Sequence, residues 1–463
     1  MTTDDAEVCV IGAGPAGATL ATRLAQLGHT VAIIEQRRFP REHIGDSLSP
    51  GVWPLLDFLG VGERVAGARD RRAAVRRVRW SSVEEERAPA EAPVVDRGAF
   101  DTILLERARH EGALVWQPAG ARRPRRVGDS WDVPVATDRV LRARFVADAT
   151  GRRRLLGGRR SPAAPRTLAL YARWRGKLAG DGMDTGIEAL ADGWLWGARL
   201  PCGDVRVMAF LDPETLLSER RDLERLYCRL LGKSAMFTEF LAGAKLVGRV
   251  HTCDATSYMA DRVVDARSVK VGEAALAIDP LSSAGVQTAI QTGLTAAAVV
   301  HTILLDGDTA AASRYYDDQL RHSSRRHAAT AAALYAEHKT YADGTFWRRR
   351  SAAARPPAPQ RTPAPLAELL LRPARLVHEA ELQYVPCLVV DRVEVRRALV
   401  HPVLERPVAF LGGVELAPLI DTLQAAPSLL LAIADWNRSI PTDRAREITL
   451  WLHQRALIDI PPS

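Results

Sequence analysis

Cysteine is scarce in this chain, and no lysine precedes Lys177. The cysteines are scattered and show no Cys-x-x-Cys spacing: Cys9, Cys202, Cys228, Cys253 and Cys387. An odd, scattered set builds neither a disulfide scaffold nor a zinc site, so we expect no metal centre and a reducing, cytoplasmic location. The first residues are acidic, which differs from the basic start of a secretory signal peptide.

Residues 280–305 contain no Asp, Glu, Lys or Arg. They do contain Ser, Thr, Gln and His, so we expect a buried helix there and no membrane span. The chain as a whole is 47% hydrophobic and 25% charged, which is ordinary for a globular protein. Its 463 residues are enough for two or three domains with sizeable cores.

The formal net charge is +8, and nearly all of the cations are arginine. We interpret most of the arginine clusters as solvated surface. The alternative is an acidic partner, such as a flavin phosphate, a reductase or an acidic polypeptide. No nucleic-acid-binding motif accompanies the charge, so we expect no nucleic acid partner. The clusters lie at residues 69–79, 122–126, 152–160 and 347–350.

A Gly-x-Gly-x-x-Gly pattern lies between an apolar run, residues 8–11, and a helical run, residues 18–27. The glycines permit a tight strand-to-helix turn and a close backbone approach to a pyrophosphate, and the helix N-terminus supplies free N–H groups. A second apolar run, residues 30–34, ends where a ribose hydroxyl needs an acceptor. The predicted contacts to an adenine dinucleotide are Gly12, Gly14, Pro15, Ala16, Gly17 and Glu35.

Two further blocks decide which dinucleotide is bound. Residues 146–151 read as a strand that ends in a turn of small residues, and residues 269–293 contain a second small-residue loop before a second helix. Such a loop can hold a flavin ring and its ribityl chain, which a nicotinamide enzyme does not need. The cofactor is therefore expected to be FAD. The predicted contacts from these blocks are Asp148, Gly151, Asp279, Pro280, Gly285 and Val286.

The three blocks, in this order, resemble the glutathione-reductase-type FAD fold of group A monooxygenases, flavin-dependent halogenases and geranylgeranyl reductases. The stretch from Gly45 to Pro50, Gly-Asp-Ser-Leu-Ser-Pro, is similar to the Gly-Glu-Ser-Leu-x-Pro stretch of the halogenase branch. Residues 97–104 are similar to that family's Arg-x-x-Phe-Asp-x-x-Leu helix, whose arginine contacts FAD. The resemblance covers most of residues 5–330 and adds Arg41, Ser47 and Arg97 to the predicted FAD contacts.

The fold class implied is α/β: a Rossmann-like FAD-binding domain with an inserted antiparallel substrate sheet, followed by a small, mostly helical domain. We place the FAD-binding domain at residues 1–160 and 262–330, and the substrate sheet at residues 161–261. A helix and a Pro-rich linker follow at residues 331–365. Residues 366–463 are similar to a winged-helix module, a type that binds DNA or leader peptides. A helical appendage that covers the active site or forms a dimer is the alternative.

Short alternating runs predict the strands of the substrate sheet. They lie at residues 168–174, 193–200 and 205–211. In the last hundred residues, helical spacing predicts helices at 413–424, 428–437 and 442–454, with Ser428 and Thr442 as N-caps. Strands are predicted at 385–390 and 456–460.

Halogenases of the family that this chain resembles use a lysine early in the sequence to relay hypohalous acid to the substrate. Here the residues around the expected place, 69–80, include arginine and no lysine. Arginine stays protonated and does not readily form a haloamine. This chain also differs from the family's Trp-x-Trp-x-Ile-Pro element. Trp194-Leu195-Trp196 is present, but the proline, Pro201, comes two residues late. We therefore expect hydroxylation of an electron-rich indole or phenol instead of halogenation.

The lost lysine and the extra C-terminal region make the chain similar to a narrower group. These flavoproteins hydroxylate a tryptophan inside another protein while a tryptophan-derived quinone cofactor is made, as for quinohemoprotein amine dehydrogenase. An aromatic substrate, carried on a polypeptide, is the expected partner. Asp46 is the candidate base for the ring proton, and a helix-capping carboxylate is the alternative interpretation.

Other functions stay open at this point. A flavin-dependent halogenase of an aromatic substrate is one alternative, and an isoprenoid reductase of the geranylgeranyl type is another. A third is a non-enzymatic FAD-bearing binding protein. The flavin could be reduced by NAD(P)H directly or by a separate flavin reductase.

Overall fold

The structure, a computed structural model, describes residues 3–67, 75–80, 85–87, 93–136, 139–176, 183–218, 222–354 and 365–459. The chain divides into two compact units. The first comprises residues 1–301 and 316–355, and the second comprises residues 302–315 and 356–463. Within the described ranges, each helix is too short or too polar to cross a lipid bilayer.

The first unit is built on an eight-stranded sheet in the order β16-β17-β8-β1-β2-β5, with β7 beside β8 and β6 beside β7. The strands β5, β2, β1, β8 and β17 run parallel. Residues 8–11 and 31–34 are fully buried runs, as expected for strands covered on both faces. The strands are β1 Thr3–Ile11, β2 Val31–Ile34, β5 Leu114–Trp116, β6 Arg125–Val127, β7 Ser130–Val135, β8 Arg139–Asp148, β16 Val264–Asp265 and β17 Ser268–Lys270.

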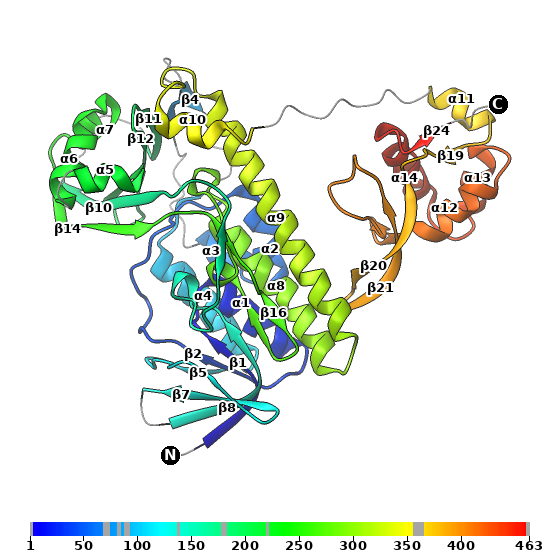
Figure 1. The fold of residues 1–463 in the computed structure, drawn as a ribbon, viewed down its shortest axis with the longest axis horizontal. Helices are drawn as coiled ribbons and strands as arrows, with labels where there is room; N and C mark the ends of the chain where they lie inside the picture. Colours follow the sequence, from blue (N-terminus) through cyan, green and yellow to red (C-terminus); the bar gives the residue numbers. More distant parts are fainter. Residues whose placement is uncertain are drawn as a thin grey trace. The chain divides into compact units, whose positions relative to one another are not determined.

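Helices α1 and α8, which follow the two glycine-containing loops, pack closely against each other (Figure 1). A Cβ added to Gly293 of α8 would lie 2.6 Å from the Ala16 carbonyl oxygen of α1. This contact brings the two loops to the same region of the sheet. The helices here are α1 Pro15–Gln26, η1 Pro50–Val52, α2 Trp53–Phe58, α3 Gly62–Gly67, α4 Arg97–His110, α8 Gly285–Leu304 and α9 Thr309–Glu337.

The predicted substrate strands form a seven-stranded sheet in the order β14-β10-β13-β12-β11-β3-β4. Neighbouring strands are antiparallel except for β3 and β11, which are parallel. Strands β3 and β4 come from the range predicted as FAD-binding domain, before α4. The strands are β3 Arg76–Arg79, β4 Glu85–Arg87, β10 Leu168–Gly176, β11 Thr185–Leu190, β12 Gly193–Arg199, β13 Val205–Leu211 and β14 Ala244–Asp254.

The two faces of this sheet carry different cores because side chains alternate along each strand. Leu195 and Val207 face a core shared with α5 Pro213–Ser218, α6 Leu223–Gly232 and α7 Ala235–Phe240 (Figure 1). Trp194, Trp196 and Phe210 face the other way, into an aromatic core that includes side chains of α9 and α10 Thr345–Ser351. The second face is the candidate substrate face.

Short elements connect the two sheets. A three-stranded sheet pairs β18 Leu276–Ala277 and β9 Arg160–Pro162 with β15 Tyr258–Ala260. The 3₁₀ turn η2 Gly151–Arg153 begins at the last residue of the second predicted FAD block, and the turns η3 Gly272–Ala274 and η4 Pro280–Ser282 lie within the third.

The second unit packs its helices around Trp436, whose Nε1 donates to the Leu419 carbonyl at 3.0 Å. Strands β20 and β21 form a two-stranded hairpin, and the Val393 N–H in β21 donates to Thr302 Oγ1 at 2.8 Å. The elements are α11 Leu366–Leu371, β19 Arg375–Leu376, β20 Glu381–Val389, β21 Arg392–Val400, β22 Phe410–Leu411, β23 Val414–Glu415, α12 Leu416–Ala425, α13 Leu429–Trp436, α14 Thr442–Gln454 and β24 Ile458–Asp459.

The predicted caps of this unit have mixed outcomes. Ser428 does cap α13, and its side chain accepts from the Leu431 N–H at 3.3 Å. The cap at Thr442 is wrong, because α14 already includes Thr442 and its N-cap position is Pro441. The order α12, α13, α14, β24 matches the predicted helix–helix–helix–strand pattern. A winged-helix role for the unit stays a prediction.

We predict that Gly197→Ala destabilises the first unit by about 1–3 kcal/mol. A Cβ on Gly197, in β12, would overlap the Phe237 ring of α7, so the helix must shift. Gly232→Ala is the matched control, because that position at the end of α6 has no neighbour within 4 Å of an added Cβ. Urea unfolding should show a lower midpoint for Gly197→Ala alone, and equal midpoints would contradict the prediction.

Candidate active site

The predicted glycine turn is close-packed backbone. Gly12 has a φ of +103°, and a Cβ there would overlap the Ala149 carbonyl oxygen beyond β8. A Cβ on Gly17 would overlap the Gly12 carbonyl oxygen. Gly14 is the N-cap of α1 and has no side chain to cap the helix, so the first backbone N–H groups are left for a ligand. Buried Pro15 occupies the first helical position, where no N–H is required.

Glu35 lies at the end of β2, beside this turn, and is 6% exposed. Its Oε2 accepts from the Ala13 N–H at 2.9 Å, and its Oε1 accepts from the Arg37 N–H at 2.8 Å. The carboxylate is thus fixed next to the glycine turn, which is consistent with the predicted role of Glu35 as an acceptor for a ribose hydroxyl. Together, the small-residue cradle, the free helix N–H groups and the carboxylate fit an adenine dinucleotide.

In the second block, Asp148 shapes the turn that follows β8. Its Oδ1 accepts from the Thr150 N–H at 3.0 Å, and its Oδ2 accepts from the Leu156 N–H at 2.7 Å. Gly151 has a φ of +59°, which glycine adopts without strain. Both side-chain oxygens of Asp148 are therefore engaged with the protein backbone. Cofactor contacts from Asp148 and Gly151 stay a prediction.

In the third block, Asp279 is buried before η4, and burial raises the pKa of its carboxyl. Its Oδ1 accepts from the Leu281 N–H at 3.0 Å. Pro280 begins η4, and Gly285 begins α8. Val286 packs in a core with residues of α2 and α4. The loop is thus fixed at both ends.

A hydrogen-bond chain joins this loop to the substrate sheet. Trp194 Nε1 of β12 donates to the Tyr335 hydroxyl of α9 at 3.2 Å, and that hydroxyl donates to Asp279 at 3.3 Å. All three side chains are buried. Tyr335 was not identified from the sequence, because a tyrosine in a long helix carries no local signal of its partner.

Residues 41–50 form a second loop, between β2 and η1. Arg41 pairs with Asp101 of α4 at 3.1 Å, and its guanidinium lies beside Gly14. Arg97 Nε also donates to Asp101 at 3.1 Å, and Arg97 Nη1 donates to the Ile44 carbonyl at 2.7 Å. The buried Asp101 therefore brings the two predicted arginines together. Ser47, in the same loop, forms an isolated β-bridge with Val94.

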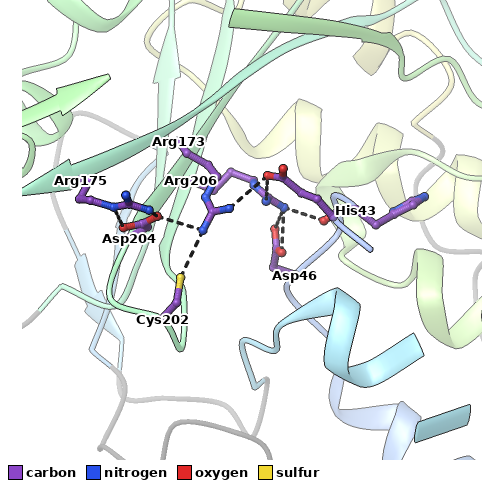
Figure 2. A network of polar contacts seen from close by, with 8 residues as sticks. His43, Asp46, Arg173, Arg175, Cys202, Asp204 and Arg206 are labelled. Carbon is purple, nitrogen blue, oxygen red and sulfur yellow. Dashed lines mark hydrogen bonds and ion pairs between the residues drawn. The ribbon is translucent and has the colours of Figure 1, made fainter. Parts of the chain in front are cut away.

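Asp46, the candidate base, is buried in an ion pair with Arg206 of β13 (Figure 2). Arg206 Nη1 lies 2.9 Å from Oδ1 and 2.8 Å from Oδ2. Burial raises the pKa of the Asp46 carboxyl, and the Arg206 guanidinium opposes part of that rise. Arg206 was not identified from sequence, because it lies 160 residues away in an ordinary strand.

Further ion pairs extend this network across the sheet (Figure 2). Arg173 of β10 lies directly opposite Arg206 in the strand register, and its Nη2 is 2.9 Å from Asp204 Oδ2. Arg175 holds the other oxygen of Asp204 at 2.8 Å, and the hydrogen bond from Arg175 lowers the pKa of Asp204. Cys202 Sγ accepts from Arg173 at 3.4 Å.

A polar cavity of about 200 Å³ adjoins these groups. It has room for a small polar portion of a ligand, since pockets for whole small molecules are usually larger. Its charged lining residues come from the 41–50 loop, the start of α4 and the substrate sheet: Arg41, Glu42, Asp46, Asp96, Arg97, Arg173 and Arg206.

The neighbouring aromatic face is densely packed. Trp194 stacks on Phe210 with ring centroids 3.9 Å apart, and Trp80 meets the edge of Trp347 at 5.2 Å. The predicted Trp-x-Trp element thus lies on β12 with both indoles buried. Of the region predicted to replace the halogenase lysine, residues 68–74 lie outside the described residues.

Sequence comparisons place the chain among known flavoproteins. A family model described as "FAD binding domain" matches residues 5–149. Tryptophan 2-halogenase of Chondromyces crocatus is 30% identical over 374 residues, which cover 75% of this chain and 71% of that protein. The chain belongs to the family of FAD-binding monooxygenases and flavin-dependent halogenases. It binds FAD and is a flavin-dependent oxidoreductase.

Flavin-dependent halogenase armH4 of Armillaria mellea is 28% identical over 64% of this chain. The match spans 65% of that halogenase, so the chain covers about two thirds of the length of such relatives. Among solved structures, "Peptidyl tryptophan dihydroxylase QhpG" matches with a TM-score of 0.76 and 27% identity, over 98% of this chain and 99% of QhpG. The halogenase CmlS matches with a TM-score of 0.76 and 22% identity over 99% of this chain, which shows a shared fold.

We predict that Gly17→Ala raises the Kd for FAD by about tenfold or more, equivalent to about 1.4 kcal/mol, and so lowers the amount of FAD retained after gel filtration. The added Cβ would displace the Gly12 carbonyl and open the turn that approaches the pyrophosphate. Gly67→Ala is the control, because an added Cβ there has no neighbour within 4 Å. The ratio of flavin to protein absorbance measures the effect, and equal ratios would refute it.

We predict that Tyr335→Phe destabilises the first unit by about 1–3 kcal/mol, because buried Asp279 loses a donor and Trp194 loses its acceptor. Tyr341→Phe makes the same change at a tyrosine that is 38% exposed and should be near neutral. Thermal unfolding compares the two variants. A similar melting temperature for both would show that the chain of hydrogen bonds contributes nothing.

Proposed function

We propose that this chain is a flavin-dependent monooxygenase that hydroxylates an electron-rich aromatic ring, namely the indole of a tryptophan residue carried by a polypeptide. The substrate class is taken from QhpG, a peptidyl tryptophan dihydroxylase whose likeness extends over 98% of this chain. The halogenase CmlS matches over 99% of this chain, so the extent of the structural match does not distinguish a hydroxylase from a halogenase. The residue chemistry has to separate them.

The observation that carries the proposal is the position of the first lysine, Lys177. A halogenating relative needs an amine that can lose its proton and carry the halogen to the ring. Arginines stand in the early region instead, and a guanidinium stays protonated at any working pH. Hydroxylation needs no such amine, because the activated oxygen is delivered to the ring directly.

FAD, when bound, supplies the chemistry that activates oxygen for attack by the ring. We assign the dinucleotide to the turn from Gly12 to Gly17, with Glu35 at a ribose and the Arg41–Arg97 pair near the phosphates. The loop of Asp279, Pro280, Gly285 and Val286 would hold the isoalloxazine side. Ser47, Asp148 and Gly151 complete the proposed contacts.

Asp46 is proposed to accept the proton that leaves the ring after hydroxylation. Burial raises the pKa of its carboxyl toward the working pH, which makes a carboxylate a more effective base. Its place on the polar cavity supports access for a ligand.

Halogenation of the same ring class is the second candidate, because the sequence relatives include a tryptophan 2-halogenase at 30% identity. The isoprenoid reductase stays an untested alternative. The reductant is proposed to be NAD(P)H or a separate flavin reductase.

The test incubates the FAD-loaded chain with oxygen and a tryptophan-containing peptide, with free tryptophan in parallel. Reduction is supplied by NADPH alone or by NADPH with an added flavin reductase, and bromide is present in half of the samples. Mass spectrometry should show one or two added oxygen atoms on the peptide, derived from labelled dioxygen. Gly17→Ala and catalase controls remove reactions of free flavin and peroxide. A brominated ring would overturn the proposal in favour of halogenation.

A further inference from the structure

Arg206 joins the substrate sheet to the loop of residues 42–46. It lies on β13, between β10 and β12, and is 3% exposed. Its Nη1 contacts Asp46 and donates to the His43 carbonyl at 2.7 Å, and its Nη2 lies 3.2 Å from Glu42. One side chain of the sheet therefore holds three residues of one loop.

That loop is connected to the proposed flavin site at both ends. On one side, Arg97 donates to the Ile44 carbonyl, and Arg41 reaches the glycine turn. On the other side, Ser49 Oγ donates to Gln287 in the first turn of α8 at 2.6 Å. A movement of residues 42–46 would therefore be felt where the flavin is proposed to lie.

Arg206 also belongs to the candidate substrate face. Residues two and four positions along β13, Met208 and Phe210, point to the same face of the sheet and enter the aromatic core. In the strand register Arg206 lies opposite Ala198 of β12, two residues after Trp196. Arg206 thus lies at the polar end of this face, beside Arg173 and Asp204, with the aromatic residues beyond it.

The charges around Arg206 are balanced, so the side chain is held by pairing. Arg173 lies beside it and shares Glu42, at 3.4 Å. The carboxylates of Glu42, Asp46 and Asp204 offset the three arginines Arg173, Arg175 and Arg206. Removal of one partner from such a buried pair leaves an uncompensated charge, which costs far more than an exposed pair is worth.

We propose that Arg206 is a positioning residue that couples occupancy of the polar cavity, which it lines, to the flavin by holding residues 42–46 in place. This inference rests on the proposed function for the identity of the substrate. A substrate group that enters this cavity meets Arg206 and the loop together, so binding there acts on residues 42–46. Loss of the link lets reduced flavin react with oxygen whether or not a substrate is in place.

The test compares Arg206→Met with Arg175→Met, the same change at a neighbouring arginine that pairs with Asp204 and is 66% exposed. Both variants should retain FAD. Arg206→Met should lose the flavin absorbance change that a tryptophan-containing peptide induces. Its yield of product per oxygen consumed should fall by about tenfold to a hundredfold, with the balance released as peroxide, because small misplacements of reacting groups have effects of this size. Arg175→Met should match the wild type.

Arg206→Lys should recover part of the coupling, since lysine keeps the charge but holds fewer acceptors. If Arg206→Met does not fold, Glu42→Gln decides, because Glu42 is 64% exposed and its loss weakens the same link. It should lower coupling in the same direction by a smaller factor. Coupling equal to that of Arg175→Met, in whichever variant folds, overturns the inference. A wild type that brominates but shows the same difference between variants overturns the proposed function alone.

Discussion

The contact between the Gly12 backbone and the carbonyl of Ala149 is the constraint on which the arrangement of the first unit depends. It brings the end of β1 and the end of β8 within van der Waals distance, so no side chain larger than hydrogen fits between them. Gly17 repeats the constraint one helical turn later, against Gly12 itself. These contacts place the first backbone N–H groups of α1 at the carboxyl ends of parallel strands, where α/β proteins bind nucleotides.

The substrate sheet is joined to two loops of the proposed flavin site, to one by an ion pair and to the other by a chain of hydrogen bonds. An ion pair from Arg206 holds the loop containing Asp46, and a neutral chain from Trp194 through Tyr335 holds the loop containing Asp279. Both connections are buried, so each costs desolvation that is recovered only when its geometry is complete. The sheet and the flavin loops are therefore expected to behave as one mechanical body, which suits an enzyme whose oxidant must not be released without a target.

Proteins that share this fold need not share the same reactive residues. The Trp-x-Trp element of β12 is similar to that of halogenases, yet here one of its indoles is a hydrogen-bond donor in a buried structural chain. The early region where a halogenase lysine was expected contains arginine and no lysine. Within the described part of that region, Arg79 pairs with Glu188. One fold can carry different functions, because function depends on a few side chains of the site.

By itself, the sequence determined the features that depend on local spacing. The glycine turn, the strands at residues 168–174 and 205–211 and the cap at Ser428 are each specified by residues near one another in the chain. The helix carrying Arg97 was expected from the resemblance to the halogenase branch. The tertiary structure alone decided the partners: Asp46 with Arg206, Asp279 with Tyr335, and β3 with β11. It also showed that Thr442 lies inside α14 instead of capping it. The physical reason is distance along the chain. Periodicity and turn chemistry act over a few residues, whereas a buried ion pair between positions 160 residues apart depends on how two sheets come together.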